Sequence, residues 1–270
     1  MRLALTAILS VLTILQVQAQ QGYELGGWVG TAWYFGDLNN NNSFSMPGLA
    51  GGVTARYDFD ERVSLRGGAS MARVRADDAV LGNEFEQKRN LHFRSMVWEG
   101  HLAGEFNFMP YVHGSRNHRF TPHIFGGFVV FGYNPQAELD GRWVDLQPYG
   151  TEGQELNDEY YAVSMAWLLG GGIKFDISQN LSVNIEWGGR FTGTDYLDDV
   201  SGVYPDKDAL LRRRGADAVR LSDPSTSDPQ IGATGRQRGN SKDNDSYHFF
   251  SIGIMRFFGG IKCPPVSREY

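Results

Sequence analysis

Residues 181–192 read Leu-Ser-Val-Asn-Ile-Glu-Trp-Gly-Gly-Arg-Phe-Thr, so large apolar residues alternate with small or charged ones. Successive side chains of a β-strand point to opposite faces of the sheet. One face of this segment therefore carries Leu181, Ile185 and Trp187, and the other carries Glu186 and Arg190. The alternation predicts a strand with one apolar and one polar face.

Seven more segments share this period of two, and their connections alternate in length along the chain. The eight predicted strands are residues 23–35, 49–59, 63–74, 91–108, 120–133, 160–175, 181–191 and 247–258. The connections after the second, fourth and sixth strands are turn-like, whereas the others are longer and polar. An even strand number with short turns at one end and long loops at the other is typical of bacterial outer-membrane barrels. We therefore predict an all-β fold, an eight-stranded antiparallel transmembrane β-barrel with short periplasmic turns and long extracellular loops. A soluble secreted β protein is the alternative.

The polar faces of these strands carry Gly, Ser and Ala between sparse charges of both signs. Small residues suit the narrow interior of an eight-stranded barrel, where side chains must fit and pair. We expect a lumen charge network of Arg56, Arg66, Glu99, His101, Glu105, Glu186 and Arg190. The apolar faces would then meet lipid, where an Arg or Lys at the midplane costs about 2–4 kcal/mol. A carboxylate beside an imidazole can also act as a catalytic base and its orienting partner, so Glu99 and His101 leave a catalytic role as the alternative.

Aromatic residues gather near both ends of the predicted strands, as the two interfaces of a membrane require. At the turn end they are Tyr23, Phe59, Phe106, Phe108, Phe120, Phe175, Phe257 and Phe258. At the loop end they are Tyr34, Phe35, Phe93, Phe131, Tyr133, Tyr161, Phe191 and Tyr247. In the last strand Arg256 shares a face with Ile252 and Ile254, so the alternation leaves the lipid-facing side of that strand undetermined.

The N-terminus has the composition of a secretory signal peptide, with Arg2, an apolar run and then Ala19. We expect cleavage between Ala19 and Gln20, which divides the chain into a signal peptide at 1–19, a barrel at 20–258 and a periplasmic tail at 259–270. A membrane-anchor helix is the alternative, but the apolar run is shorter than a membrane span. The net charge of −6 comes with no basic stripe, which argues against nucleic acid as a partner.

The long extracellular loop at 194–244 contains Asp195, Asp198 and Asp199 close together. Hard oxygen ligands at this density can bind calcium, but the spacing is not that of an EF-hand, and capping of the loop is the other interpretation. The rest of the loop is polar and poor in apolar residues, which predicts that part of it is mobile. We assign no catalytic residue, no metal and no cofactor.

Several motifs lie outside the strands and are more specific than the alternation. They are Gly36-Asp37-Leu38-Asn39, Leu139-Asp140-Gly141-Arg142-Trp143-Val144, Pro148-Tyr149-Gly150-Thr151-Glu152-Gly153-Gln154, Thr194-Asp195-Tyr196-Leu197-Asp198-Asp199-Val200-Ser201 and Lys262-Cys263-Pro264. Together they resemble the PorG-like outer-membrane proteins of the Bacteroidota type IX secretion and gliding machinery. The resemblance covers nearly the whole mature chain, but the insertion at 203–240 lies outside its pattern.

The resemblance implies a non-enzymatic outer-membrane component that ties a periplasmic ring to the membrane, with both termini in the periplasm. The ring is the one built from proteins resembling the PorK lipoprotein and PorN. Candidate contacts with an acidic partner are His113, Arg116, His118 and Arg119 in one periplasmic turn, and a turn that is merely solvated is the alternative. The lone Cys263 is a candidate for a disulfide with a ring subunit, or it stays free. A surface adhesin or receptor, and an enzyme acting on lipid or peptide, are the alternative functions.

Overall fold

A computed structural model describes residues 21–260 of the chain. The predicted signal peptide at 1–19, its cleavage site between Ala19 and Gln20, and Cys263 in the tail lie outside the described residues. Those three predictions therefore stay predictions.

Eight strands form one closed antiparallel barrel, as the alternation predicted. They are β1 (Gly22–Phe35), β2 (Gly48–Asp58), β3 (Val63–Asp77), β4 (His92–Asn107), β5 (Phe120–Leu139), β7 (Val163–Asp176), β8 (Leu181–Thr192) and β9 (Ser246–Gly259). Each strand pairs with the next along the chain, and β1 pairs with β9 to close the cylinder. Every predicted strand is present within a few residues of its expected ends, except that β5 runs six residues further, to Leu139 rather than 133.

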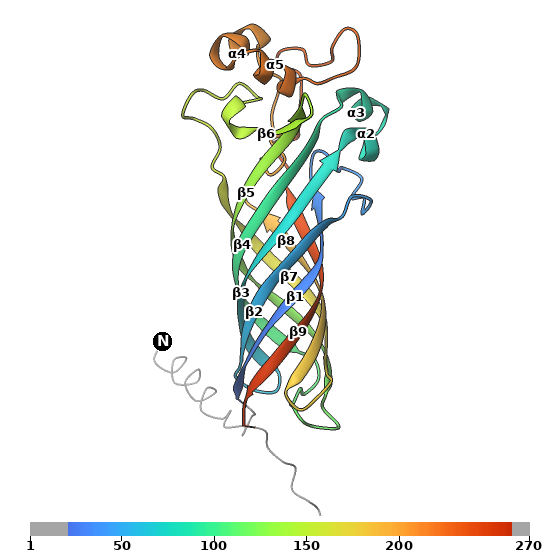
Figure 1. Cartoon of the computed structure of the whole chain (residues 1–270), viewed down its shortest axis with the longest axis vertical. Helices are drawn as coiled ribbons and strands as arrows, with labels where there is room; N and C mark the ends of the chain where they lie inside the picture. Colours follow the sequence, from blue (N-terminus) through green and yellow to red (C-terminus); the bar gives the residue numbers. More distant parts are fainter. Residues whose placement is uncertain (1–20, 261–270) are drawn as a thin grey trace, which may run out of the picture.

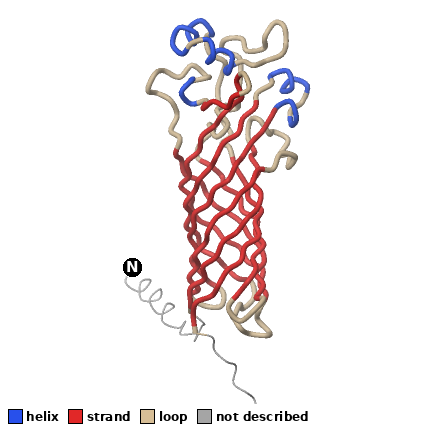
Figure 2. Tube along the Cα trace, in the orientation of Figure 1, coloured by secondary structure: helices blue, strands red, loops and turns tan. Residues whose placement is uncertain are grey.

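The short and long connections sort to opposite ends of the cylinder, as Figures 1 and 2 show. The long connections hold the remaining elements: α2 (Asp78–Leu81), α3 (Glu84–Arg89), β6 (Arg142–Asp145), the 3₁₀ turn η1 (Gln147–Tyr149), α4 (Lys207–Arg214) and α5 (Ala216–Ser222). Among the described residues, no helix is long and apolar enough to cross a membrane. Gly22 pairs with Gly259, so both ends of the described chain lie at the short-turn end.

The outward wall of the barrel is apolar. Its exposed side chains include Leu25, Val29, Leu49, Val53, Met71, Trp98, Leu102, Phe128, Val163, Trp167, Leu169 and Ile252. The last strand, which the sequence left undetermined, points Phe250, Ile252 and Ile254 outward and buries Tyr247 and Phe249. Arg256 therefore faces outward close to the short-turn end, where its guanidinium lies 5.3 Å from the centre of the Phe258 ring.

The predicted aromatic band at the loop end is wrong for six of its eight members. Tyr34, Phe35, Phe93, Phe131, Tyr133 and Tyr247 are buried, most of them inside the upper barrel, and at the turn end Phe257 is buried too. Tyr161 and Phe191 are exposed as expected. Phe35 has outward parity and is covered by the rings of Phe44 and His248. For the other buried rings the cause is parity, because a residue's position in the alternation, not its distance from the strand end, decides which face it joins.

The long connection at 194–244 is partly helical, and the prediction that part of it is mobile stays a prediction. It contains α4 and α5, whose side chains Leu210, Ala218 and Leu221 are buried. Asp206 caps α4 by accepting from the N–H of Ala209. The few apolar residues of the segment are spaced so that they pack together, which average composition does not show.

The exposed wall gives the first prediction. Val29 is 72% exposed and lies opposite Gly51 and Ile252, near the middle of its strand. If this wall meets lipid, Val29→Arg should lower the free energy of unfolding from phospholipid vesicles by about 2–4 kcal/mol. Urea titration followed by the heat-dependent gel shift of folded barrels measures it. Val203→Arg, at an exposed site in the long connection, is the matched control, and equal effects of the two changes would contradict a lipid-facing wall.

Candidate functional site

The lower lumen holds a dense network of ion pairs around Arg56. Its guanidinium contacts Glu24 at 2.8 Å and Glu105 at 3.1 Å. Arg66 contacts Glu186 at 2.8 Å and Glu105 at 3.3 Å. These side chains are almost fully buried, so each charge is stable there only because it is paired.

A second cluster lies higher, around Glu99. Arg190 contacts this carboxylate at 2.8 Å, and the hydroxyls of Tyr247 and Ser70 donate to it at 2.7 and 2.8 Å. The nearest nitrogen of His101 lies 3.8 Å from Glu99, beyond hydrogen-bonding distance. The carboxylate is therefore occupied by Arg190 and two hydroxyls and does not orient the imidazole, which favours the structural network over a catalytic pair.

The structure thus brings all seven predicted network residues into the lumen, and it adds members that the sequence analysis missed. Lys174 forms an ion pair with Glu105, and His123 lies 3.2 Å from Glu186. Glu24 is the third addition. Lys174 has the inward parity of its strand, so the alternation alone could have identified it.

Two groups of lumen residues have donor atoms close enough to hold a metal ion. They are Glu24 with Asp58 and His113, and Glu105 with His123 and Glu186. Glu24 already binds Arg56, and Glu105 already binds Arg56 and Lys174. A metal ion would have to displace or face these cations, so the arrangement favours ion pairing over metal binding. Asp195, Asp198 and Asp199 form no such group among the described residues.

Side chains fill the described lumen. Two cavities beside Arg66 and Glu186 measure about 20 and 10 Å³. Each has room for about one water molecule at most. The ion pairs therefore close the cylinder to solutes.

At the loop end, a third polar cluster ties the long connection to the barrel. The Tyr34 hydroxyl lies 2.5 Å from Asp198 and 2.8 Å from Asp245. A hydroxyl has a single hydrogen, so a second hydrogen on one of the carboxyl groups is needed for both contacts to be hydrogen bonds. Burial, together with the neighbouring Asp245 charge, holds the pKa of Asp198 well above its usual value, which supplies that hydrogen.

The other aspartates of the predicted acidic motif are also structural. Asp199 accepts from Thr151 at 2.5 Å and from Tyr160 at 2.8 Å, so it joins two long connections. Burial raises its pKa to about 6 despite the opposing charge of Arg238. Burial also raises the pKa of Asp195 to about 7, and the charge of Asp37 adds to this effect. These contacts favour loop capping over calcium binding.

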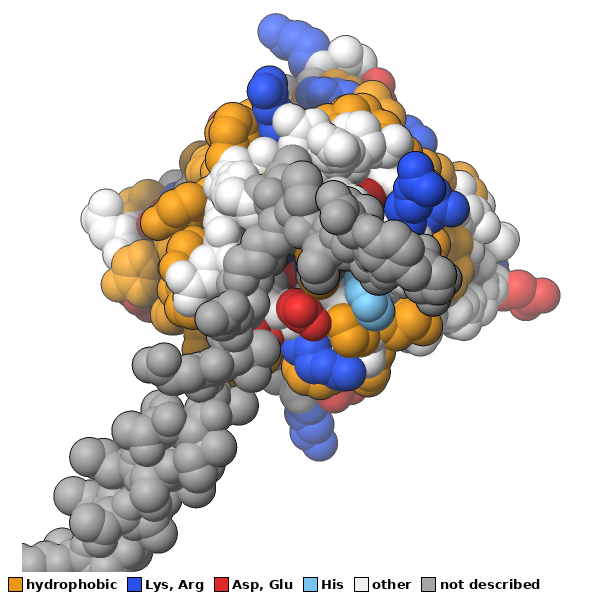
Figure 3. Space-filling model, turned by 90° about the horizontal axis from the view of Figure 1, so that it is seen from below, with side chains coloured by type: hydrophobic (Ala, Val, Ile, Leu, Met, Phe, Trp, Pro, Cys, Tyr) orange, Lys and Arg blue, Asp and Glu red, His pale blue; other side chains and the backbone are white. Residues whose placement is uncertain are grey.

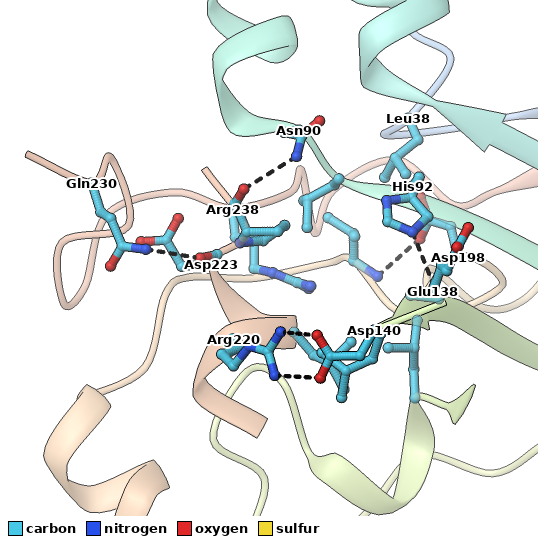
Figure 4. A pocket seen from close by; sticks show the side chains of 17 residues that line it. Leu38, Asn90, His92, Glu138, Asp140, Asp198, Arg220, Asp223, Gln230 and Arg238 are labelled. Carbon is cyan, nitrogen blue, oxygen red and sulfur yellow. Dashed lines mark hydrogen bonds and ion pairs between the residues drawn. The ribbon is translucent and has the colours of Figure 1, made fainter. Parts of the chain in front are cut away.

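The folded loops enclose a cavity of about 360 Å³ at the loop end. Figure 4 shows Arg220 and Asp140 paired along one side of it, with Asn90, Gln230 and Arg238 on the other. Its lining also includes Leu91, Ala137, Leu146 and Leu221, so the cavity is lined by both apolar and polar side chains.

The candidate partner contacts at the short-turn end separate into two kinds. His113 is buried, stacks on Phe257 and lies 3.0 Å from Asp176 and 3.3 Å from Glu24. It seals the barrel mouth, so the prediction that it faces a partner is wrong. Arg116, His118 and Arg119 are exposed. Figure 3 shows basic side chains at several places around this end, with acidic side chains near its centre and at its right edge.

The chain resembles known proteins at two levels, a sequence family and the arrangement of its strands. A family model described as "Domain of unknown function (DUF6089)" matches residues 2–218. No curated protein matches the sequence. Solved structures with a similar strand arrangement include Neisserial surface protein A (10% identity, TM-score 0.44, covering 88% of this chain and 97% of that one). OprG of Pseudomonas aeruginosa is similar at 9% identity and TM-score 0.45, covering 90% and 98%. Ail of Yersinia pestis, solved with a heparin analogue, is similar at 8% identity and TM-score 0.41, covering 89% and 99%.

The upper ion pair gives the second prediction. Arg190→Met leaves Glu99 buried without its cation and should lower the free energy of unfolding by about 3–5 kcal/mol. Adding Glu99→Gln to Arg190→Met should recover a large part of that loss, because the unpaired charge is removed. Urea unfolding of the single and double variants in the same detergent measures the coupling. Strictly additive losses would contradict a buried ion pair.

The acidic loop cluster gives the third prediction. The folded-state pKa values of Asp195 and Asp199, about 7 and about 6, lie above the unfolded value of about 3.9. The folded loops therefore bind more protons than the unfolded ones, so their stability is full below about pH 4 and falls as pH rises toward 7. Hydrogen exchange of residues 193–245, corrected for intrinsic rate, should be faster at pH 8 than at pH 5. Asp195→Asn should reduce that difference, and an unchanged pH response would contradict the assignment.

Proposed function

We infer that this chain, which belongs to the family described as Domain of unknown function (DUF6089), is a non-enzymatic outer-membrane protein that anchors a periplasmic assembly. The observation that carries the proposal is the combination of an apolar outward wall with a lumen closed by ion pairs. Such a barrel is held in lipid and passes nothing through its centre.

The outward wall supports the membrane location. An open sheet edge cannot lie in hydrocarbon, because each unpaired backbone group costs several kcal/mol, and the β1–β9 pairing leaves no edge. Exposed side chains such as Val29, Leu49 and Trp167 would be costly in water at this density and are suited to acyl chains. The even strand number then puts both described ends on the side of the short turns, which in bacterial barrels is the periplasm.

The short-turn end supports a periplasmic partner. Arg116, His118 and Arg119 lie exposed on one turn, and Arg62 is exposed on the neighbouring turn. Arg62 donates to the carbonyl of Phe108, which holds the two turns together. A fixed basic edge of this kind suits an acidic protein surface. Together with the resemblance to the PorG-like proteins, this edge makes ring proteins resembling PorK and PorN the proposed partners in type IX secretion.

A surface receptor is the second candidate, and one observation favours it. The loop end is folded, and it encloses the cavity of about 360 Å³, which is within the usual range for small-molecule sites. An enzyme is less well supported, because Glu99 and His101 lie in the filled lumen and are not arranged as a base and its partner.

The anchoring proposal gives the fourth prediction. In cells that carry the secretion machinery, the tagged double variant Arg116→Glu/Arg119→Glu should recover the periplasmic ring proteins at least about fivefold less than the wild type, because like charges then face an acidic partner. Quantitative mass spectrometry of the pull-down measures the recovery. The same samples on non-reducing gels test the proposed disulfide through Cys263.

The matched control is Arg212→Glu/Arg213→Glu, an equal charge change on exposed residues of α4 at the other end. It should leave recovery of the ring unchanged. If the α4 variant abolishes recovery and the turn variant does not, the function lies at the loop end and the receptor is favoured. A protein that is extracted without detergent would remove the membrane premise altogether.

A further inference from the structure

Three arginines gather on the outward wall at the loop end of β3 and β4. Arg75 and Arg94 are direct partners in the antiparallel pairing, and Arg73 lies one step below them opposite Met96. The Cβ atoms of directly opposed residues are roughly 5 Å apart, and like charges at that position destabilise a sheet. An anion bound between them would remove the repulsion.

No ion pair satisfies these arginines within residues 21–260. Arg94 is held by neutral groups, because its Nε donates to Gln136 at 3.1 Å and its guanidinium stacks 3.9 Å from the Trp143 ring. Arg75 donates to the carbonyl of Pro47 at 3.2 Å. Three acids are close along the strands. Asp77 accepts from the N–H of Ala79, Asp145 accepts from the amides of Asn134 and Gln136, and Glu138 lies two residues beyond Gln136 on the same face of β5. The guanidinium groups of Arg75 and Arg94 are therefore held by neutral groups, and no carboxylate within residues 21–260 forms an ion pair with them.

Directly below the arginines the outward wall is hollowed. The hollow measures about 590 Å³ and is bordered by Met71, Trp98, Val130 and Val163. It exists because Gly100 sits opposite Ala69 on the neighbouring strand, so no bulky side chain fills the space between. Its walls are almost entirely apolar, and its upper rim leads to Arg73, two residues beyond Met71 on the same face of β3.

The height of the arginines matches a membrane boundary. The outward residues of β3 are apolar or small from Val63 to Met71, and the first charge is Arg73. Ten residues at about 3.4 Å each, tilted by about 40°, rise roughly 26 Å, which is close to the apolar band of about 25 Å in outer-membrane barrels. The three guanidinium groups therefore stand at the level of the outer head groups.

We propose that Arg73, Arg75 and Arg94 together with the hollow bordered by Met71 and Trp98 form a site for a phosphate-bearing lipid of the outer leaflet. The guanidinium forks bind the phosphate, which they match in geometry and charge. One acyl chain fills the hollow. The site rests on the proposed membrane location, but not on the anchoring of a periplasmic ring.

The test uses the purified full-length protein in detergent, with diphosphoryl lipid A as the probe and native mass spectrometry as the readout. Arg75→Gln/Arg94→Gln should weaken retention of the lipid at least tenfold. Gly100→Leu should also weaken it at least tenfold by filling the hollow. A Cβ on Gly100 meets nothing within 4 Å, so this change is compatible with the fold.

Two matched controls keep the test specific. Arg256→Gln removes an outward arginine at the opposite end, and Gly104→Leu adds the same side chain at an equally open outward glycine outside the hollow. Both should retain the lipid like the wild type.

The lipid site is contradicted if retention is unchanged in Arg75→Gln/Arg94→Gln, or if it is lost equally in the two controls. The proposal is also overturned if inorganic phosphate binds as tightly as the lipid and Gly100→Leu has no effect. That result would show an anion site without a groove for an acyl chain. Loss of ring recovery in cells has no bearing on this result, so the two proposals fail separately.

Discussion

The pairing of buried charges in a narrow lumen is the constraint on which the rest of this structure depends. Eight strands enclose only enough room for side chains, so every inward charge must find a partner within that space. Arg56 reaches Glu24 on β1 and Glu105 on β4, and Arg66 reaches Glu186 across the barrel on β8. The contact with Glu24 joins paired neighbours, whereas the contacts of Arg56 with Glu105 and of Arg66 with Glu186 join strands that are not neighbours in the sheet. They therefore fix the register more firmly than backbone pairing alone, because a shift of one residue would move each charge to the outward wall.

Alternation made most of the barrel predictable from the sequence, including all seven expected lumen residues. It succeeded because parity is a local property that a single strand reveals. It also explains the failure at the loop end, where Tyr34, Phe131 and Tyr247 were assigned to the interface by position although they share the inward parity of Glu24, His123 and Phe249. The rings pack inside the upper barrel, where the hydroxyls of Tyr34 and Tyr247 bind buried carboxylates.

The folded loop end was beyond what the sequence could predict, for a different physical reason. Its stability comes from contacts between segments far apart in the chain, such as Thr151 and Tyr160 with Asp199, and Tyr34 with Asp198. Local composition registers those aspartates as solvated loop residues or metal ligands, since the partners are not visible along the sequence. The burial of His113 could not be predicted from the sequence for the same reason, because its partners Glu24 and Asp176 come from β1 and β7.

A filled lumen restricts where this protein can act. Opening a path along the axis would separate Arg56, Arg66 and Arg190 from their carboxylates, and each buried pair broken by loss of one partner costs about 3–5 kcal/mol. Several such losses approach the whole stability of a small domain, about 5–15 kcal/mol. The surfaces that remain accessible are the basic edge of the short turns, the loop-end cavity and the outward wall beneath Arg73, and the proposed functions are confined to them. Those three surfaces lie at different heights of the barrel and are built from different residues, so the partners proposed for them would not compete for the same side chains.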